Sequence, residues 1–251
     1  MTTDSPATLA PTPTSATRWV QLGIGVICMM AISSPQYVWT LFTKPIAGKL
    51  DVSLAQIQVT FSILIVLQTF LAPVQGYLIE KFGPRRLLSV GAIFTGASWV
   101  LAAHAGNLGM LYLTYGVLGG IGTGIIYIGV IGLMVKWFPD QRGLATGVVA
   151  AGYGMGAVLT TFPIANSLAA VGYERTLSVY GVLIGAVGLA AALTLKRPPV
   201  AYAPSAAWLS SSVQTRSIAP KAMLKTGIFW LMFVMMAMMS TSGLMVISQM
   251  A

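Results

Sequence analysis

The sequence predicts an all-α, polytopic membrane protein, and its composition and hydropathy pattern carry that prediction. Of 251 residues, 56% are hydrophobic and 8% are charged, with a mean hydropathy of +0.82. A soluble globular chain carries about 25% charged residues, so these proportions exclude soluble enzymes, secreted domains and disordered regulators. The apolar residues form long runs without the alternating polarity of a spanning β-barrel. Helices then remain as the structure that pairs every backbone polar group within lipid.

Seven runs reach the roughly 20 apolar residues that a membrane-spanning helix needs. They cover residues 19–43, 54–79, 87–104, 108–135, 144–168, 177–195 and 227–251. The first six predict one transmembrane bundle over residues 18–195, and the last predicts a seventh helix. Residues 1–17, rich in Thr and Pro, predict a disordered cytoplasmic tail, and the polar segment 196–226 predicts a cytoplasmic linker.

The distribution of basic residues predicts which helix ends face the cytoplasm. The net charge is +9, but the lysines and arginines lie in short breaks between apolar runs and form no basic face for nucleic acid. With the N-terminus inside, the inner segments hold eleven of the fourteen basic residues, as the positive-inside rule requires. We therefore expect a multi-pass protein of the inner (cell) membrane with a cytoplasmic N-terminus.

Residues of the first three predicted helices match those of the next three at an offset of 90 positions. The matches are Tyr37 with Tyr127, Leu54 with Leu144, Ala55 with Ala145, Arg85 with Arg175, Leu87 with Leu177 and Gly91 with Gly181. Because three is odd, the second repeat enters the membrane upside down relative to the first. Such 3+3 inverted repeats build the six-helix halves of secondary transporters and place the substrate near the membrane midplane.

A turn rich in charged residues joins the second and third predicted helices. Residues 76–86 read GYLIEKFGPRR, in which Gly83 and Pro84 make the turn and Glu80 can pair with a nearby Arg or Lys. This string resembles the helix 2–3 signature of the major facilitator superfamily, with Glu80 where an Asp is usual. The resemblance implies a cytoplasmic gate that latches the two halves of a transporter. The gate residues that it implies are Gly76, Glu80, Lys81, Gly83, Arg85, Arg86 and Arg142.

Three further strings narrow the resemblance. They are residues 35–42 (PQYVWTLF), 136–145 (KWFPDQRGLA) and 150–156 (AAGYGMG). With Tyr127, they resemble the oxalate:formate antiporter group, close to the monocarboxylate transporters. This resemblance implies the N-terminal half of a twelve-helix transporter with its linker and seventh helix, and a chain that is a fragment lacking most of the second half. It also implies exchange of small carboxylates by alternating access.

Polar side chains in the first, fourth and fifth helices predict a site for a small carboxylate. Pro35 removes a backbone hydrogen bond and bends the first helix. The bend lets Gln36 and Tyr37 converge, although adjacent helical positions lie about 100° apart. Tyr127 and Tyr153 bring phenols to the depth of the midplane. In the resembling family these four positions line the substrate cavity, and interhelical packing is the alternative for each single tyrosine.

The acidic residues bear on the mechanism. Asp4, Asp51, Glu80, Asp140 and Glu174 all lie in predicted tails or loops, so the bundle has no proton relay built from carboxylates. Exchange is therefore favoured over proton symport. In the resembling family the cationic ligands lie in the second half, so we expect a small organic anion, the lipid bilayer and the missing C-terminal half as partners of a monomeric protein. A proton-coupled monocarboxylate carrier and a non-transporting membrane sensor stay open as alternatives.

The remaining motifs favour packing over chemistry. Glycines stripe the predicted fourth and fifth helices, but no strand precedes them, so they predict close helix packing rather than a nucleotide site. Cys28, His104 and the methionine-rich seventh helix form no cluster with an acid at a common depth. We therefore predict no enzyme activity, no cofactor and no metal.

Overall fold

The computed structural model describes residues 15–199 and 220–249, and every regular element within these ranges is a helix. The chain divides into two compact units, Met1–Ala203 and Pro204–Ala251, which are described separately. The first unit contains α1 (Ser15–Ala31), α2 (Ser34–Tyr37), α3 (Trp39–Leu50), α4 (Leu54–Phe70), α5 (Ala72–Phe82), α6 (Pro84–Ala103), α7 (Leu108–Leu111), the π-helix η1 (Tyr112–Leu118), α8 (Gly119–Trp137) and α9 (Arg142–Thr194). The second contains α11 (Pro220–Met223) and α12 (Gly227–Gln249).

The first unit forms six membrane spans within residues 15–199. The run from α7 through η1 to α8 and the single helix α6 are each long and apolar enough to cross a bilayer, and α4 with α5 makes one span bent by 55°. α9 has 53 residues and, if straight, would extend for about 80 Å, far beyond a bilayer. Non-helical backbone at Gly172 divides it into two spans. Together with the broken first span α1–α3, these segments confirm the predicted six-helix bundle.

Two glycines with positive φ form the turns inside the two predicted repeats. Gly83, between α5 and α6, has φ 92° and ψ 145°, and Gly172, inside α9, has φ 79° and ψ 169°. Glycine enters this backbone region because it has no Cβ to clash. Each turn joins the second span of a repeat to its third span. Gly172 falls one position short of the residue that matches Gly83 at the offset of 90. The repeats therefore share a turn geometry as well as matching residues.

The first span is broken at two points rather than bent at one. α1 ends at Ala31, the four-residue α2 follows, and α3 begins at Trp39 after a second break at Val38. Pro35 occupies the first turn of α2, where its missing N–H costs no intrahelical hydrogen bond. The bend predicted at Pro35 thus takes the form of two breaks. They leave backbone carbonyls within a membrane span that need donors from other helices.

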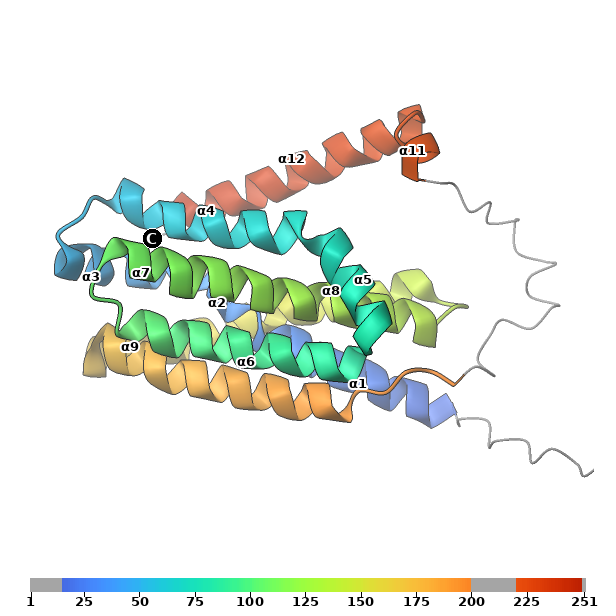
Figure 1. Cartoon of the computed structure of the whole chain (residues 1–251), viewed down its shortest axis with the longest axis horizontal. Helices are drawn as coiled ribbons and strands as arrows, with labels where there is room; N and C mark the ends of the chain where they lie inside the picture. Colours follow the sequence, from blue (N-terminus) through green and yellow to red (C-terminus); the bar gives the residue numbers. More distant parts are fainter. Residues whose placement is uncertain (1–14, 200–219, 250–251) are drawn as a thin grey trace, which may run out of the picture. The chain divides into compact units, whose positions relative to one another are not determined.

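Glycine-rich faces hold α6 between α8 and the second part of α9 (Figure 1). A Cβ on Gly122 of α8 would lie 2.8 Å from the backbone nitrogen of Thr95 in α6. A Cβ on Gly181 of α9 would lie 2.9 Å from the carbonyl oxygen of Gly96, also in α6. These separations leave no room for a side chain. The predicted packing role is therefore confirmed for Gly122, whereas Gly181 lies outside the fourth and fifth helices to which that prediction applied.

The first span begins earlier and ends later than predicted. α1 begins at Ser15, so the last three residues of the predicted tail 1–17 are helical, and residues 1–14 lie outside the described part. α3 continues to Leu50, past the predicted end at residue 43. Both ends extend because helix formation continues through the polar residues that border the apolar run.

The second unit agrees with the predicted seventh helix. α12 begins at Gly227, as predicted, and its 23 residues extend for about 35 Å, enough to cross a bilayer. Part of the predicted linker 196–226 is helical, because α11 begins at Pro220. The linker residues 200–219 and the terminal residues 250–251 lie outside the described part.

The contact between α1 and α9 can be tested at Gly156. A Cβ here would lie 2.4 Å from the carbonyl oxygen of Met30, whereas nothing lies within 4 Å of a Cβ built on Gly154 in the same helix. We expect Gly156→Ala to lower the free energy of unfolding by about 1–3 kcal/mol, because the two helices must move apart. Gly154→Ala should leave stability unchanged or raise it, since alanine is the better helix former. Thermal melting in detergent measures both variants, and equal melting temperatures would contradict the contact.

Candidate functional site

The four residues predicted to bind substrate meet around one phenol. The Tyr153 hydroxyl, on the first part of α9, donates a hydrogen bond of 2.7 Å to Oε1 of Gln36 on α2. The rings of Tyr37 and Tyr127 each contact the Tyr153 ring edge-on, with ring centroids 5.4 Å apart in both pairs. We call these four residues the tyrosine cluster. Tyr37 and Tyr127, which match at the offset of 90, therefore flank Tyr153 as a repeat-related pair.

The tyrosine cluster keeps polar groups available at its surface. Tyr153 is buried, whereas Gln36, Tyr37 and Tyr127 are half-buried. The hydrogen bond from Tyr153 occupies Oε1 of Gln36 and leaves its Nε2 group as a donor. Because α2 is a short separate helix, the neighbouring side chains of Gln36 and Tyr37 both reach the cluster. The arrangement offers amide and hydroxyl donors that suit an oxygen anion.

Sequence reasoning missed Tyr115, which supports the broken first span. Its fully buried hydroxyl donates a hydrogen bond of 2.8 Å to the carbonyl oxygen of Pro35. Its ring packs on Trp39, with centroids 4.3 Å apart, and on Trp99, with centroids 6.3 Å apart. Tyr115 lies in η1, and such π-helical turns occur frequently at functional sites. The sequence contains one indication of such a residue. A span that is broken at a proline leaves carbonyl groups that need a hydrogen-bond donor from a neighbouring helix.

Two glutamines of the bent second span were also missed. Gln68, near the end of α4, lies beside the Tyr153 hydroxyl, and its Oε1 is buried without a hydrogen bond among the described residues. Gln75 of α5 is 3% exposed, and both atoms of its amide lack a partner there. Gln75 lies against Gly124 of α8, whose Cβ would come within 2.7 Å of the amide nitrogen. Polar side chains at membrane depth tend to be functional, and that rule could have found both glutamines.

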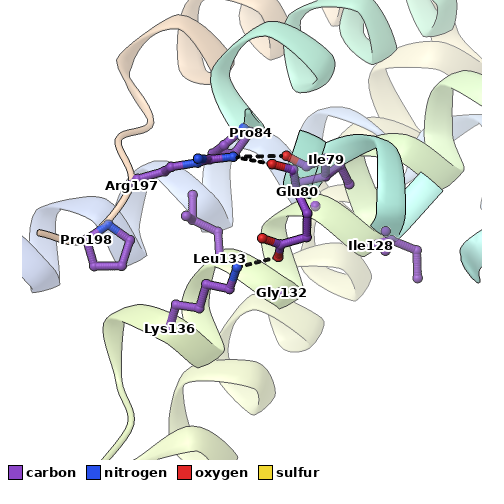
Figure 2. A pocket seen from close by; sticks show the side chains of 11 residues that line it. Ile79, Glu80, Pro84, Ile128, Gly132, Leu133, Lys136, Arg197 and Pro198 are labelled. Atoms are coloured by element: carbon purple, nitrogen blue, oxygen red, sulfur yellow. Dashed lines mark hydrogen bonds and ion pairs between the residues drawn. The ribbon is translucent and has the colours of Figure 1, made fainter. Parts of the chain in front are cut away.

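A charged pocket lies at the end of the bundle that contains the α5–α6 turn, which we call the Gly83 end. Its volume is about 270 Å³ (Figure 2). Glu80 forms an ion pair with Lys136 of α8 across this pocket. Nη2 of Arg197 donates to the carbonyl oxygens of Ile79 and Glu80, at 3.3 and 2.8 Å. The predicted pairing of Glu80 with a nearby cation is thus observed, but neither Lys136 nor Arg197 was among the predicted gate residues.

Most of the other predicted gate residues lie at the α5–α6 turn or line a pocket beside it, whereas Arg142 lies at the start of α9. Gly83 forms the turn, Gly76 lines the charged pocket, and the Lys81 ammonium lies 5.5 Å from the centroid of the Phe82 ring. Arg85 and Arg86 line a second pocket of about 350 Å³ at the start of α6. Arg142 begins α9, lines neither of these two pockets, and has no hydrogen bond or ion pair from its side chain within the described ranges.

Two further ion pairs join distant segments at the ends of the bundle. Arg18 binds Asp140 at 3.1 Å, and its guanidinium lies 5.1 Å from the centroid of the Phe138 ring. This pair ties the start of α1 to the connection between α8 and α9. At the opposite end, Lys49 of α3 pairs with Glu174, just after the Gly172 turn. The Lys49–Glu174 pair lies at exposed positions and contributes little to stability alone. In the other pair the Arg18 side chain is half-buried.

No charged side chain is buried in the described part of the first unit. Asp51, Glu80, Asp140 and Glu174 are all exposed there, and the buried polar residues are uncharged. Within the same ranges, no three His, Cys, Asp or Glu side chains lie close enough to hold a metal ion. The buried polar side chains of the described residues are therefore uncharged: hydroxyls, amides and the indole N–H groups of Trp39 and Trp99.

Comparison with known proteins agrees with this architecture. The family model of the Major Facilitator Superfamily matches residues 22–250. The chain is 32% identical over 246 residues to the oxalate:formate antiporter of Oxalobacter formigenes, an alignment that covers 98% of this chain and 57% of that protein. It is 30% identical over 239 residues to the uncharacterized MFS-type transporter YhjX of Escherichia coli (strain K12), covering 95% of this chain and 58% of that protein.

A shorter similarity links the chain to monocarboxylate transporters. It is 31% identical over 111 residues to monocarboxylate transporter 14 of Mus musculus, covering 44% of this chain and 22% of that protein. The chain thus spans less than two thirds of the length of each of these relatives. The family match covers most of the chain and agrees with the six spans and the GYLIEKFGPRR turn. This chain therefore belongs to the Major Facilitator Superfamily and is an all-α, multi-pass membrane protein.

Proposed function

We propose that the chain forms one half of a secondary transporter that exchanges small carboxylate anions, of the oxalate and formate type, by alternating access. The tyrosine cluster is the observation that carries this proposal, because it gathers an amide and three phenols from three helices beside the break in the first span. Such groups donate hydrogen bonds to carboxylate oxygens, and hydrogen bonds to an ionised acceptor are the strong ones. The similarity to an oxalate:formate antiporter supports the same class of substrate.

The distribution of charge supports exchange rather than proton symport. Every described Asp and Glu is exposed, so these spans offer no buried carboxylate that could carry a proton. An anion in a water-poor site also needs a positive countercharge, and the described residues bury no Lys or Arg. We propose that a C-terminal half of the same transporter supplies this cation opposite the tyrosine cluster. A single copy of the intact transporter then contains the complete site. It moves the substrate across the membrane without changing it chemically.

The proposed orientation places the N-terminus and the Gly83 end in the cytoplasm, across an inner membrane. This choice follows the concentration of Lys and Arg at that end of the bundle. The Glu80–Lys136 ion pair and the Arg197 contacts with α5 then lie at the cytoplasmic gate. Because the pair is exposed, it can break and form without a large desolvation cost.

A proton-coupled monocarboxylate carrier is the second candidate, favoured by the similarity to monocarboxylate transporter 14. Its proton-carrying group would lie outside the described residues.

Counterflow in proteoliposomes separates the two candidates. We load vesicles of the intact transporter with unlabelled oxalate and measure entry of labelled formate or oxalate. Entry that persists after the pH gradient is collapsed supports exchange; entry that stops supports the proton-coupled carrier. No flux of any carboxylate would favour a non-transporting sensor.

Tyr153→Phe tests the central phenol. The variant keeps the ring contacts but removes the hydrogen bond to Gln36, so we expect about a fivefold rise in the KM for oxalate exchange, the effect of losing roughly 1 kcal/mol. Tyr77→Phe is the matched control, because Tyr77 is 64% exposed and its hydroxyl forms no hydrogen bond with a described residue. Initial rates of counterflow measure both variants. An unchanged KM for Tyr153→Phe would remove the cluster from the substrate site.

A charge exchange tests the gate. Glu80→Lys places a second cation beside Lys136. Because these like charges repel each other, we expect the exchange rate to fall severalfold. Adding Lys136→Glu to the same protein restores an opposite-charge pair and should recover most of the rate. Counterflow rates of the two single variants and the double variant measure the coupling. If the double variant is as slow as the product of the single effects, the ion pair has no role in gating.

A further inference from the structure

The second pocket at the Gly83 end carries a concentration of positive charge that the proposed transport step does not use. It is formed by the α5–α6 turn and by the segment that follows α9, and its volume is about 350 Å³. The lining residues are Phe82, Gly83, Pro84, Arg85, Arg86, Leu195, Lys196 and Arg197. Four of them are basic and none is acidic. We infer that this pocket, the Arg86 pocket, binds the phosphate group of an anionic membrane lipid.

The acidic residues at this end are already paired elsewhere. Glu80 pairs with Lys136, and Asp140 pairs with Arg18. The other two acidic residues in the described ranges, Asp51 and Glu174, lie after α3 and after the Gly172 turn, at the opposite end. The side chains of Arg85, Arg86 and Lys196 consequently have no ion pair with any described residue. An anion from outside the chain is the partner that fits them.

The segment after α9 is held in place by hydrogen bonds to distant parts of the chain. The backbone nitrogen of Lys196 donates to Oε1 of Gln21 at 2.8 Å. Nε1 of Trp137 donates to the carbonyl oxygen of Lys196 at 2.9 Å. Nη2 of Arg197 donates to the carbonyl oxygen of Glu80 at 2.8 Å (Figure 2). The backbone that carries two of the four cations is thus positioned before a ligand arrives, which lowers the entropic cost of binding.

The place of the pocket favours a lipid as the source of the phosphate. It lies where α6 begins and the last span of the bundle ends, at the level where lipid headgroups meet a spanning helix. Phe82, at its edge, is 51% exposed and offers an apolar surface to an acyl chain. Basic pockets of this kind on the cytoplasmic side of a membrane bind anionic headgroups. This step rests on the proposed orientation, though not on the proposed substrate.

Native mass spectrometry of the intact transporter tests the inference by counting bound lipid. We add phosphatidylglycerol, phosphatidylcholine or inorganic phosphate separately to the detergent-purified protein. We expect retained phosphatidylglycerol, little phosphatidylcholine, and no displacement of the bound lipid by millimolar phosphate. The double variant Arg86→Gln/Lys196→Gln should bind phosphatidylglycerol at least about tenfold more weakly, because each basic residue near the membrane surface adds to the attraction. Arg197 is left unchanged, since its guanidinium also binds α5.

Two controls separate the pocket from total charge and from misfolding. Arg142→Gln/Arg175→Gln removes the same charge from exposed positions of the first unit outside the pocket and should retain lipid binding. Arg86→Lys/Lys196→Arg keeps the charges and should also retain it. Equal losses in the two glutamine variants, or equal retention of phosphatidylcholine, would overturn the inference. Displacement by inorganic phosphate would overturn the lipid as the source. Lipid counting needs no substrate, so its failure is distinct from a failure of carboxylate exchange.

Discussion

The structure depends on one requirement of the bilayer, that each backbone carbonyl within a span must find a donor. The two breaks around Pro35 open the hydrogen-bond ladder of the first span, and the Tyr115 hydroxyl supplies a donor to the Pro35 carbonyl. That support comes from a π-helical turn in the fourth span and from a ring packed between two tryptophans. The broken segment can then carry Gln36 and Tyr37 to Tyr153 without leaving an unpaired carbonyl at that position.

The second and fourth spans connect the tyrosine cluster to the Gly83 end. α8 carries Tyr127 at the cluster and Lys136 about two and a half turns later at the charged pocket. The bent second span carries Gln75 beside α8 and Glu80 at the ion pair. Because α8 contributes to both places, and the second span carries Gln68 beside Tyr153 as well as Glu80, a shift of this span against α8 would alter the cluster and the ion pair together. Such a shift would couple the substrate site to the gate during the proposed alternating access.

Residue chemistry was enough to predict the tyrosine cluster, since hydroxyls and amides stand out in apolar helices. The same reasoning applied more widely would have included Gln68 and Gln75, whose amides have buried atoms without a hydrogen-bond partner among the described residues. Arg197 could not be found this way, because a cation just beyond a span is already explained by membrane orientation. Its contact with the carbonyls of α5 depends on how the ends of two distant spans meet. The repeat offset indicated the pairing of Tyr37 with Tyr127, but Tyr153 as their common partner emerged from packing.

The sequence by itself determined the helical class, the six spans of the bundle, the turn at Gly83 and the family. Each of these is a local property: the length of an apolar run against the thickness of a bilayer, or a glycine where no Cβ fits. The tertiary structure alone decided which side chains are partners, such as Tyr115 with Pro35 and Lys136 with Glu80. These contacts join residues on different helices, and their distances depend on how glycine faces pack and where helices break, which no single segment encodes.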